Sequence, residues 1–523
     1  MKMDLETHFG RNVYVYPERP GNIADMLFES AQKYQDKVAL VSNDHRLSYG
    51  DFWVRSEHIA GNLQKQYGIF KGDRIAVLLG NSIEFALIVF ACARLGAILV
   101  PLNTRLQEKE LKHMILNSKP KAIFVDEEFV PKMNTLKNEV NQLNAHYFLI
   151  GKETSSDYLS FKQLEQQSQL DTVSVHEDDP FFLMYTSGTT GLPKGALGTH
   201  LGVIHSVLSY ENVLKTNALT KTLIAVPLFH VTGLIGQLIH MVRVGGTSVL
   251  MRRYKTDPFL ELISKEKISF LFNVPSIYIM MMSSEQFRLH EYSSVTCIAY
   301  GGASMPTEAI FKLRKYFPHA HLHNCYGATE TSSPTTIMPQ KYDDSKLASV
   351  GKPVPGAELK IVNEDGEEQP LGEEGELLIK GPMVIGGYWK NKQANKAAFV
   401  EGYWRSGDMA KIDEDGFVYI LDRKKDMINR GGEKVYSIEV ENVLHQHPDI
   451  LEAAVIGIPH PIYGEVVKAF VVTNNKLLSE DNIKEFVSEK LADYKVPAKI
   501  EFLSQLPRNP GGKVLKHTLK NAQ

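Results

Sequence analysis

Short hydrophobic runs alternate with longer stretches of helical periodicity from about residue 20 to residue 350. Arg74–Leu79 has the pattern of a strand, Ser82–Leu95 follows it with helical spacing, and Ala122–Val125 is a second strand after another helical stretch. Such alternation predicts βαβ units, in which helices cover largely parallel sheets. We therefore expect an α/β fold whose ligands bind outside the carboxyl ends of the strands.

The pattern changes after Gly351 to short alternating segments separated by turns. Glu358–Val362 and Gly375–Ile379 have the alternation of half-buried strands, and Asn363–Gly366 between them is a turn sequence. These segments predict a small antiparallel β subdomain, which we extend over residues 351–422.

A second boundary falls at the charged cluster Asp422–Asp426, which follows the apolar Phe417–Leu421. A new α+β pattern begins there, about one hundred residues long, which is enough for a small domain. Its expected helices and strands are Ser437–His445, Ala453–Ile458, Val466–Val472 and Ser479–Leu491. The predicted organisation is an N-terminal domain of residues 1–422, a hinge at 423–425 and a C-terminal domain of residues 426–523.

The most apolar stretch, Ile83–Pro101, does not have the pattern of a membrane span. Glu84 and Arg94 interrupt it and Gly96 falls within it, so a buried helix followed by a strand explains it better. The opening residues Met1–Glu6 include acidic side chains and no apolar core, so no secretory signal is expected.

Charge and cysteine content narrow the expected partners and compartment. The 523 residues carry a formal net charge of −3. This balance gives no electrostatic footprint for nucleic acid, so we expect small-molecule partners; a homodimer is compatible with it. The cysteines are Cys92, Cys297 and Cys325, too few and too widely spaced for a disulfide framework or a zinc site. We expect a protein of the reducing cytoplasm.

The run Tyr185–Gly195 concentrates small residues, hydroxyls and one lysine directly after the strand-like Phe181–Tyr185. Glycines let backbone N–H groups approach phosphate oxygens, hydroxyls add donors, and Lys194 supplies a positive charge. A Walker loop is excluded, because Pro193 stands where the second glycine is required and Gly195 where the Mg²⁺-binding hydroxyl should be. The run therefore predicts a phosphate-binding loop of another kind, with an ordinary glycine-rich turn as the alternative.

Four further motifs follow this loop in order: Asn324–Glu330, Trp404–Asp408, Asp422–Asp426 and Pro507–Lys513. In this order they resemble the motifs of the adenylate-forming superfamily, which contains acyl-CoA synthetases, firefly-type luciferases and the adenylation domains of peptide synthetases. The resemblance extends from about residue 20 to residue 520. It implies a large N-terminal domain, a mobile C-terminal domain and activation of a carboxylic acid by ATP.

The resemblance implies roles for individual residues of these motifs. Glu330 would be a ligand of Mg²⁺, Tyr326 would present its face to adenine, and Asp408 with Arg423 would bind the ribose. Lys513, on a glycine-flanked loop, would bridge the substrate carboxylate and ATP and then withdraw. Taken alone, a residue such as Glu330 is more often solvated at a helix start, and an aromatic residue such as Tyr326 more often packs in the core. Asp408 and Arg423 would more often be turn residues, and a lysine in a polar tail, such as Lys513, is usually solvated.

The resemblance also implies fuller sets of residues, with ATP, Mg²⁺ and coenzyme A as cofactors. The implied catalytic residues are Lys513, Glu330, Thr189, Lys194 and His230, and the hinge residue is Lys425. The implied nucleotide-binding residues are Thr186, Ser187, Gly188, Thr189, Thr190, Lys194, Gly302, Asn324, Cys325, Tyr326, Gly327, Thr329, Asp408, Arg423 and Lys513.

The segment Pro227–Gly233 separates this chain from the branch of the superfamily that activates amino acids. That branch carries an aspartate after a phenylalanine to hold the α-ammonium, and His230 stands at the matching place after Phe229. A histidine cannot pair with an ammonium as a carboxylate does, so the expected substrate lacks an α-amino group. The acyl pocket is expected to contain His230, Tyr300, Gly301, Gly302 and Ala303. A plain strand-to-helix turn is the alternative for the two glycines.

The expected acyl acceptor is coenzyme A. No carrier-protein domain follows Lys513 in this sequence, so the acceptor should be diffusible. Gly432 keeps the glycine that relatives have near the thioester tunnel, and the resemblance implies that it binds CoA together with Glu433. The surrounding Asn429–Val435 is richer in glycine than the matching segment of plant coumarate ligases and luciferases, and Lys434 stands where those relatives have glutamine.

We therefore expect an AMP-forming carboxylic acid–CoA ligase acting on a fatty or aromatic acid. Acyl-AMP and pyrophosphate would form first, then acyl-CoA and AMP. Two alternatives remain: an acid-adenylating enzyme that loads a carrier protein, and a degenerate nucleotide-binding member of the family. Lys513, Glu330 and the phosphate loop argue against the second, because such groups serve to neutralise charge in the reaction.

Overall fold

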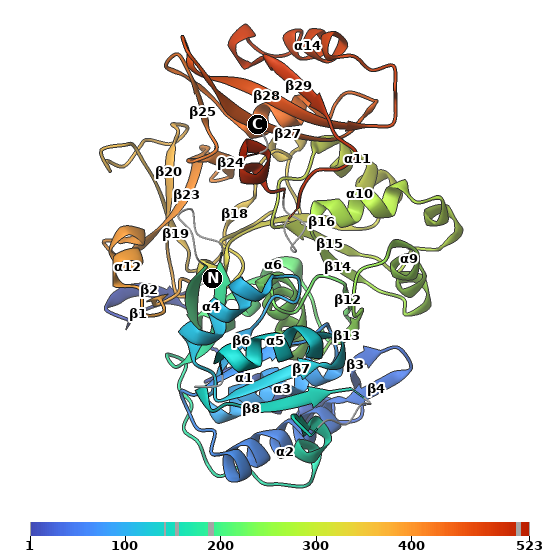
Figure 1. The fold of residues 1–523 in the computed structure, drawn as a ribbon, viewed down its shortest axis with the longest axis vertical. Helices are drawn as coiled ribbons and strands as arrows, with labels where there is room; N and C mark the ends of the chain where they lie inside the picture. Colours follow the sequence, from blue (N-terminus) through green and yellow to red (C-terminus); the bar gives the residue numbers. More distant parts are fainter. Residues whose placement is uncertain (1, 141–142, 152–155, 187–192, 509–513, 522–523) are drawn as a thin grey trace.

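A computed structural model describes residues 2–140, 143–151, 156–186, 193–508 and 514–521. In these residues the chain forms two large sheets, a smaller antiparallel sheet, a C-terminal sheet and an N-terminal hairpin. Figure 1 shows the C-terminal sheet, in orange and red, at one end of the molecule and the blue and cyan strands toward the other end. The predicted α/β class is confirmed.

The first large sheet has eight described strands and is parallel except at one edge. Strands β5 to β10 pair in parallel, whereas β10 pairs antiparallel with β11 and β11 with β21. In sheet order the strands are β21 (Gly387–Tyr388), β11 (Lys194–Thr199), β10 (Pro180–Thr186), β6 (Ile98–Pro101), β5 (Arg74–Leu78), β7 (Ala122–Asp126), β8 (His146–Ile150) and β9 (Leu159–Ser160).

The second large sheet has nine described strands and is parallel from β16 to β3. Its two edges are antiparallel, through β17 and β18 on one side and β4 on the other. In sheet order the strands are β18 (Lys352–Pro353), β17 (Thr336–Ile337), β16 (His321–Tyr326), β15 (Cys297–Gly301), β14 (Phe270–Asn273), β12 (Lys221–Ile224), β13 (Thr247–Leu250), β3 (Val38–Ser42) and β4 (His45–Ser48).

Helix α3 (Ile83–Leu95) lies between the two large sheets and is apolar and buried on all sides, apart from Glu84 and Arg94 near its ends. The Ser82 side chain accepts a hydrogen bond from the Phe85 N–H and begins the helix, and Gly96 ends it in the left-handed conformation with φ +65°. The helix contacts β6 in one sheet and β3 in the other. The predicted buried helix and following strand are confirmed, and no described helix has the length and apolar character to cross a membrane.

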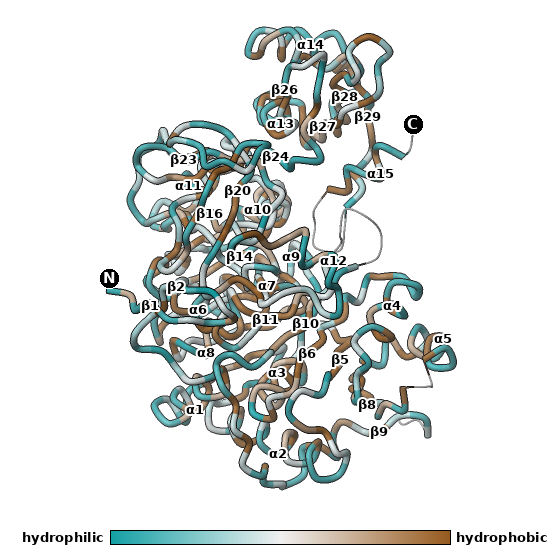
Figure 2. The backbone as a smooth tube through the Cα atoms, turned by 90° about the vertical axis from the view of Figure 1, so that its left-hand side faces the viewer, coloured by the Kyte–Doolittle hydropathy of each residue, from teal (hydrophilic) through white to brown (hydrophobic). Residues whose placement is uncertain are grey.

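The other helices of the N-terminal part are amphipathic or buried covers of the two sheets. Figure 2 shows hydrophobic chain, in brown, gathered in inner strands such as β5, β6 and β14. These helices are α1 (Ile23–Lys33), α2 (Tyr49–Tyr67), α4 (Glu108–Ser118), α5 (Val130–Val140), α6 (His200–Leu214), α7 (Val231–Gly233), α8 (His240–Val244), α9 (Thr256–Lys265), α10 (Pro275–Ser283), α11 (Thr307–Tyr316) and α12 (Lys392–Ala398).

The antiparallel sheet contains the strands that the alternating pattern predicts. Its strands are β19 (Glu358–Val362), β20 (Gly375–Lys380), β23 (Tyr403–Ile412), β22 (Phe399–Val400) and β24 (Val418–Arg423). Two strands of the region after Gly351 join the large sheets instead: β18 pairs with β17, and β21 pairs with β11. This part of the chain therefore connects both large sheets.

The C-terminal sheet follows the expected α+β pattern, with longer strands and shorter helices than predicted. Its elements are β25 (Ile428–Arg430), β26 (Glu433–Val435), α13 (Ser437–Leu444), β27 (Ile450–His460), β28 (Gly464–Thr473), α14 (Glu480–Ser488), β29 (Lys499–Phe502) and α15 (Lys516–Asn521). Helix α14 ends three residues before the predicted Leu491. Glu489 and Lys490 form an exposed turn there, and this turn lets Leu491 pack against the domain core.

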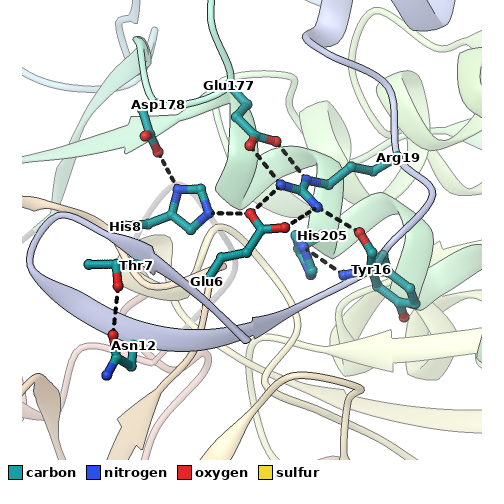
Figure 3. Close-up of polar contacts among 9 residues, drawn as sticks. All are labelled: Glu6, Thr7, His8, Asn12, Tyr16, Arg19, Glu177, Asp178 and His205. Carbon is teal, nitrogen blue, oxygen red and sulfur yellow. Dashed lines mark hydrogen bonds and ion pairs between the residues drawn. The ribbon is translucent and has the colours of Figure 1, made fainter. Parts of the chain in front are cut away.

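The N-terminal hairpin, β1 (Asp4–His8) and β2 (Arg11–Val15), is fastened to the turn before β10 by a cluster of charges (Figure 3). The Arg19 guanidinium donates to Glu177 Oε2 at 2.6 Å and to Glu6 Oε2 at 2.7 Å. His8 lies between Glu6 and Asp178, 3.0 Å and 2.8 Å away. Glu6, His8 and Glu177 are close enough to share a metal ion, but Arg19 already supplies the cation between the carboxylates.

Arg19→Ala should lower the free energy of unfolding by about 2 kcal/mol, because it leaves two partly buried carboxylates without their charged donor. Thermal denaturation would measure the loss, with Arg19→Lys as the control that keeps the charge but not the forked geometry. The hydrogen bond from Arg19 lowers the pKa of the Glu6 carboxyl. Its contribution is therefore present at neutral pH and lost on acidification, and the difference between the proteins should shrink as Glu6 is protonated. Equal stability at neutral pH would contradict the assignment.

Candidate active site

The segment predicted to bind phosphate begins and ends on two antiparallel strands of the first sheet. Thr186, at the end of β10, pairs with Lys194, at the start of β11, so the two strands hold the ends of the loop at a fixed separation. Ser187, Gly188, Thr189 and Thr190 lie outside the described residues, as does Lys513.

Glu330 lies at the point where the two large sheets meet. It belongs to the short turn Thr329–Thr331 after β16, and its side chain is buried. Its Oε1 accepts hydrogen bonds from the Thr186 hydroxyl and from the Tyr388 hydroxyl, each at 3.0 Å. In the described part of the chain no donor bonds to Oε2. One oxygen thus fixes the carboxylate and the other is available to a hard cation such as Mg²⁺.

Tyr388 connects this carboxylate to the lysine of the loop. Its ring centroid lies 5.7 Å from Lys194 Nζ, and its hydroxyl accepts a bond from Trp404 Nε1 at 3.4 Å. Burial raises the pKa of Tyr388, and the negative charge of Glu330 raises it further. The hydroxyl therefore keeps the proton that it donates to Glu330. Tyr388 was not among the residues predicted from the sequence. Only the two glycines directly before it, Gly386 and Gly387, mark the position locally.

Tyr326, Asp408 and Arg423 form a second group beside Glu330. Asp408 and Arg423 are directly opposite on β23 and β24, with Nε and Oδ1 2.8 Å apart. Tyr326 donates its hydroxyl to Asp408 Oδ2 at 2.5 Å, and burial with this carboxylate raises the tyrosine pKa well above its usual value. A nearly buried carboxylate with neighbouring cation and phenol is suited to hold paired hydroxyl groups.

The other predicted nucleotide residues occupy the strand end that supports this group. Asn324 donates its amide to the Ser349 carbonyl at 3.0 Å, and Thr329 begins the turn that carries Glu330. The Cys325 side chain is buried in the core, so its backbone alone can reach a ligand. A Cβ at Gly327 would lie 1.6 Å from the Ser333 carbonyl oxygen, so only glycine fits there.

The predicted acyl-pocket residues lie in different environments. Gly302, with φ +79°, and Ala303 are exposed beyond the end of β15, whereas Tyr300 is fully buried in the core. His230 precedes α7, and its buried Nε2 has no partner among the described residues. Burial, reinforced by the charge of Arg105, lowers the pKa of His230 to about 4, so the imidazole is neutral at physiological pH.

A cavity of about 270 Å³ opens where the carboxyl ends of both large sheets face each other. Arg252 pairs there with Asp126 at 2.5 Å and with Glu128 at 2.8 Å. The exposed Arg105 guanidinium has no ion pair among the described residues. The lining residues are Gly80, Asn81, Thr104, Arg105, Ala225, Pro227, Phe229, Arg252, Arg253 and Tyr254. These arginines were not predicted, because Arg105 and the pair Arg252–Arg253 follow different strands and meet only in the folded chain.

The predicted hinge residue Lys425 lies in an exposed turn between β24 and β25. Its neighbour Lys424 pairs with Glu376 of β20 at 3.1 Å. In the C-terminal part, Gly432 has φ +98° and donates its N–H to Asn429 Oδ1 at 3.0 Å, and the exposed Glu433 begins β26. Among the described residues, no hydrogen bond or ion pair joins Lys425, Gly432 or Glu433 to the Glu330 group, by which we mean Glu330 with its donors Thr186 and Tyr388.

Two family models match the chain along most of its length. The model of the AMP-binding enzyme matches residues 27–389, and that of the AMP-binding enzyme C-terminal domain matches residues 439–513. The chain belongs to the AMP-binding enzyme family of the adenylate-forming superfamily, and it is an AMP-forming acid–thiol ligase that uses ATP, Mg²⁺ and coenzyme A.

Relatives of known activity cover nearly the whole chain. A 2-succinylbenzoate–CoA ligase of Bacillus licheniformis is 34% identical over 496 residues, which are 94% of this chain and 98% of that protein. A long-chain-fatty-acid–CoA ligase of Escherichia coli is 31% identical over an alignment of 545 residues, gaps included, which covers 97% of this chain and 95% of the other protein.

Solved structures agree with the fold. The anthranilate–CoA ligase AuaEII in complex with anthranoyl-AMP superposes with a TM-score of 0.91 at 28% identity, covering 97% of this chain and 98% of its own. MatB from Rhodopseudomonas palustris, also 28% identical, superposes with a TM-score of 0.88 in its ATP-bound form and 0.78 in its apo form. Both MatB matches cover 96% of this chain and 98% of the other.

Glu330→Gln should reduce acyl-AMP formation by two to three decades, about 3–4 kcal/mol, and raise the Mg²⁺ concentration needed for half-maximal rate. The amide keeps the shape and the acceptor for Thr186 but removes the charge. Tyr388→Phe is the matched control, since it removes one neutral donor and should cost about 1 kcal/mol without changing the Mg²⁺ dependence. ATP–pyrophosphate exchange at varied Mg²⁺ measures both. An unchanged Mg²⁺ dependence in Glu330→Gln would exclude the metal role.

Proposed function

We propose that the Glu330 group and the Tyr326–Asp408–Arg423 group together form the adenylation site of a carboxylic acid–CoA ligase. In the first step a carboxylate oxygen attacks the α-phosphorus of ATP, pyrophosphate leaves, and acyl-AMP forms. In the second step the CoA thiol loses its proton and attacks the acyl carbonyl, and AMP leaves. The observation that carries the proposal is the convergence of both groups at the carboxyl edge of the nine-stranded sheet.

Each residue has a defined part in this proposal. Asp408 and Arg423 bind the ribose hydroxyls, and the Tyr326 ring faces adenine. Thr186 and Lys194 bind phosphate oxygens together with the loop between them. Glu330 is the residue suited to hold Mg²⁺, which would supply positive charge to the phosphates. We assign Thr189 and Lys513 to the same reaction because they match the family motifs.

The proposed acceptor is free coenzyme A, and the proposed acid lacks an α-amino group. The neutral His230 supports this assignment, because it offers no charge to an ammonium. Gly432 and Glu433 would contact CoA once the C-terminal domain has turned. The acid is proposed to be aromatic or fatty, since the relatives act on 2-succinylbenzoate, anthranilate and long-chain fatty acids. Thioester formation measured with acetate, decanoate, palmitate and benzoate tests this range, and activity that requires a carrier protein would favour the alternative class.

We further propose the division into domains 1–422 and 426–523 with the hinge at 423–425. The two family models, which end and begin at residues 389 and 439, support a boundary in this interval. We also propose a cytoplasmic enzyme. Its three cysteines support this location, because all are buried and unpaired. A homodimer is a further proposal that sedimentation would test.

Lys513→Ala should abolish most acyl-AMP formation, by two to three decades in rate, because the lysine neutralises two anions as they approach each other. Thioester formation from supplied acyl-AMP should stay close to the wild-type rate. The two half-reactions are measured separately, with Lys520→Ala as a control for loss of charge near the C-terminus. Equal damage to both half-reactions would contradict a lysine that serves the first step alone.

Lys425→Pro should impair one half-reaction far more than the other. Lys513 and the CoA thiol cannot reach the same carbonyl at once, so the C-terminal domain must turn, and proline at the hinge fixes φ near −65°. Lys424→Pro is not a matched control, because it also removes the pair with Glu376; Lys425→Ala is, since it removes the same side chain and leaves the backbone free. Unchanged rates for both half-reactions would refute the pivot.

A further inference from the structure

Two neighbouring residues of β24 contact different parts of the molecule: Arg423 contacts the proposed adenylation site, and Asp422 contacts the C-terminal part. Arg423 faces Asp408 in the adenylation site, with Nε and Oδ1 2.8 Å apart. Asp422, one residue earlier, points to the other face of the strand, as alternation requires. Its nearly buried Oδ2 accepts hydrogen bonds from the N–H of Ser437 at 2.6 Å and from its hydroxyl at 2.7 Å. One step along the backbone thus joins the nucleotide site to the C-terminal part.

Asp422 completes the beginning of a helix that its own sequence leaves uncapped. Ser437 is the first residue of α13, and the preceding Tyr436 makes no side-chain cap. The first N–H groups of a helix need acceptors from elsewhere, and a carboxylate also complements the positive end of the helix dipole. The acceptor for Ser437 comes from a strand of the N-terminal part, on the other side of the proposed hinge.

The Ser437 hydroxyl also accepts a hydrogen bond from the last described helix, α15, and so links that helix to Asp422. Lys516, in α15, donates to Ser437 Oγ at 2.5 Å and pairs with Glu441 Oε1 at 2.7 Å. The side chains of Lys516 and Glu441 are each 16% exposed, so a mostly buried ammonium pairs directly with one carboxylate and reaches Asp422 through the Ser437 hydroxyl. Burial raises the pKa values of Asp422 and Glu441, and removing one partner leaves the others with uncompensated charge.

The proposed catalytic lysine, Lys513, lies outside the described residues, between Arg508 and Val514, which are the described ends of its segment. Arg508 and Val514 pair across these ends, and the Leu515 N–H donates to the Pro507 carbonyl at 2.8 Å. Lys516 is the next residue. A constraint on its ammonium is therefore a constraint on where these ends lie relative to β24.

We infer that Asp422 is a positioning residue for adenylation, which holds the C-terminal domain through Ser437 and Lys516 in the orientation described here. This inference rests on the proposed function, because Lys513 must reach the acid and ATP in the first step and leave before the second. In this arrangement the chain is closer to the ATP-bound form of MatB than to its apo form. Ser437 and Lys516 turn with the C-terminal domain whereas Asp422 does not, so the contact belongs to the first step.

The test compares the half-reactions of Asp422→Asn and wild type, with the most active acid among acetate, decanoate, palmitate and benzoate. ATP–pyrophosphate exchange should fall on the order of tenfold, because a charged hydrogen-bond partner is lost. Thioester formation from supplied acyl-AMP should not fall and should rise if opening of the contact limits it. Glu439→Gln is the matched control: it removes a carboxylate from the same helix, but its partner Lys495 lies within the C-terminal domain. It should leave both half-reactions near the wild-type rate.

A purely structural role for Asp422 predicts equal loss in both half-reactions, and that result, or no loss in either, would overturn the inference. If Asp422→Asn does not fold, as judged by circular dichroism, Ser437→Ala carries the test, since it keeps the N–H contact and removes only the relay to Lys516. The same ratio of half-reactions then decides. Absence of exchange in the wild type would refute the proposed function itself, whereas exchange that Asp422→Asn and Ser437→Ala leave unchanged would refute this inference alone.

Discussion

The buried carboxylate of Glu330 is the constraint on which the site depends. A buried carboxylate must be hydrogen-bonded, and its donors, Thr186 and Tyr388, come from the eight-stranded sheet, whereas Glu330 follows a strand of the nine-stranded sheet. The carboxyl end of β16 therefore has to lie against β10 and β21 at this point. This contact brings Thr186 and Lys194, the free oxygen of Glu330, and the proposed ribose-binding group Tyr326–Asp408–Arg423 to one place.

Strand β24 connects the proposed adenylation site to the C-terminal part of the chain. Because side chains alternate along a strand, Arg423 can serve the nucleotide while Asp422 serves the C-terminal helices. Both contacts are charged and at least partly buried, so they tolerate little displacement. The proposed hinge begins directly after them, at a turn where Lys425 is exposed and carries no such contact.

Local patterns in the sequence predicted many of the helices and strands, and the resemblance to the adenylate-forming superfamily implied the motif residues that the structure brings together. Alternation predicted β19 and β20, and the amphipathic and apolar runs predicted α3 and α13. Tyr388 was beyond such reasoning, because β21 is two residues long and its partner strand lies nearly two hundred residues earlier. The same holds for the contact between Asp422 and Ser437 and for the arginines of the cavity, since non-local pairing leaves no local periodicity.

The central claim is that the acid is activated as an acyl adenylate, and oxygen transfer tests it most directly. The enzyme is supplied with ATP, CoA and the most active acid labelled with ¹⁸O in its carboxylate, and the products are examined by mass spectrometry. The account predicts one ¹⁸O atom in AMP and none in pyrophosphate, because the carboxylate attacks the α-phosphorus. Label in inorganic phosphate, with ADP as the nucleotide product, would mean attack at the γ-phosphorus and would contradict the account.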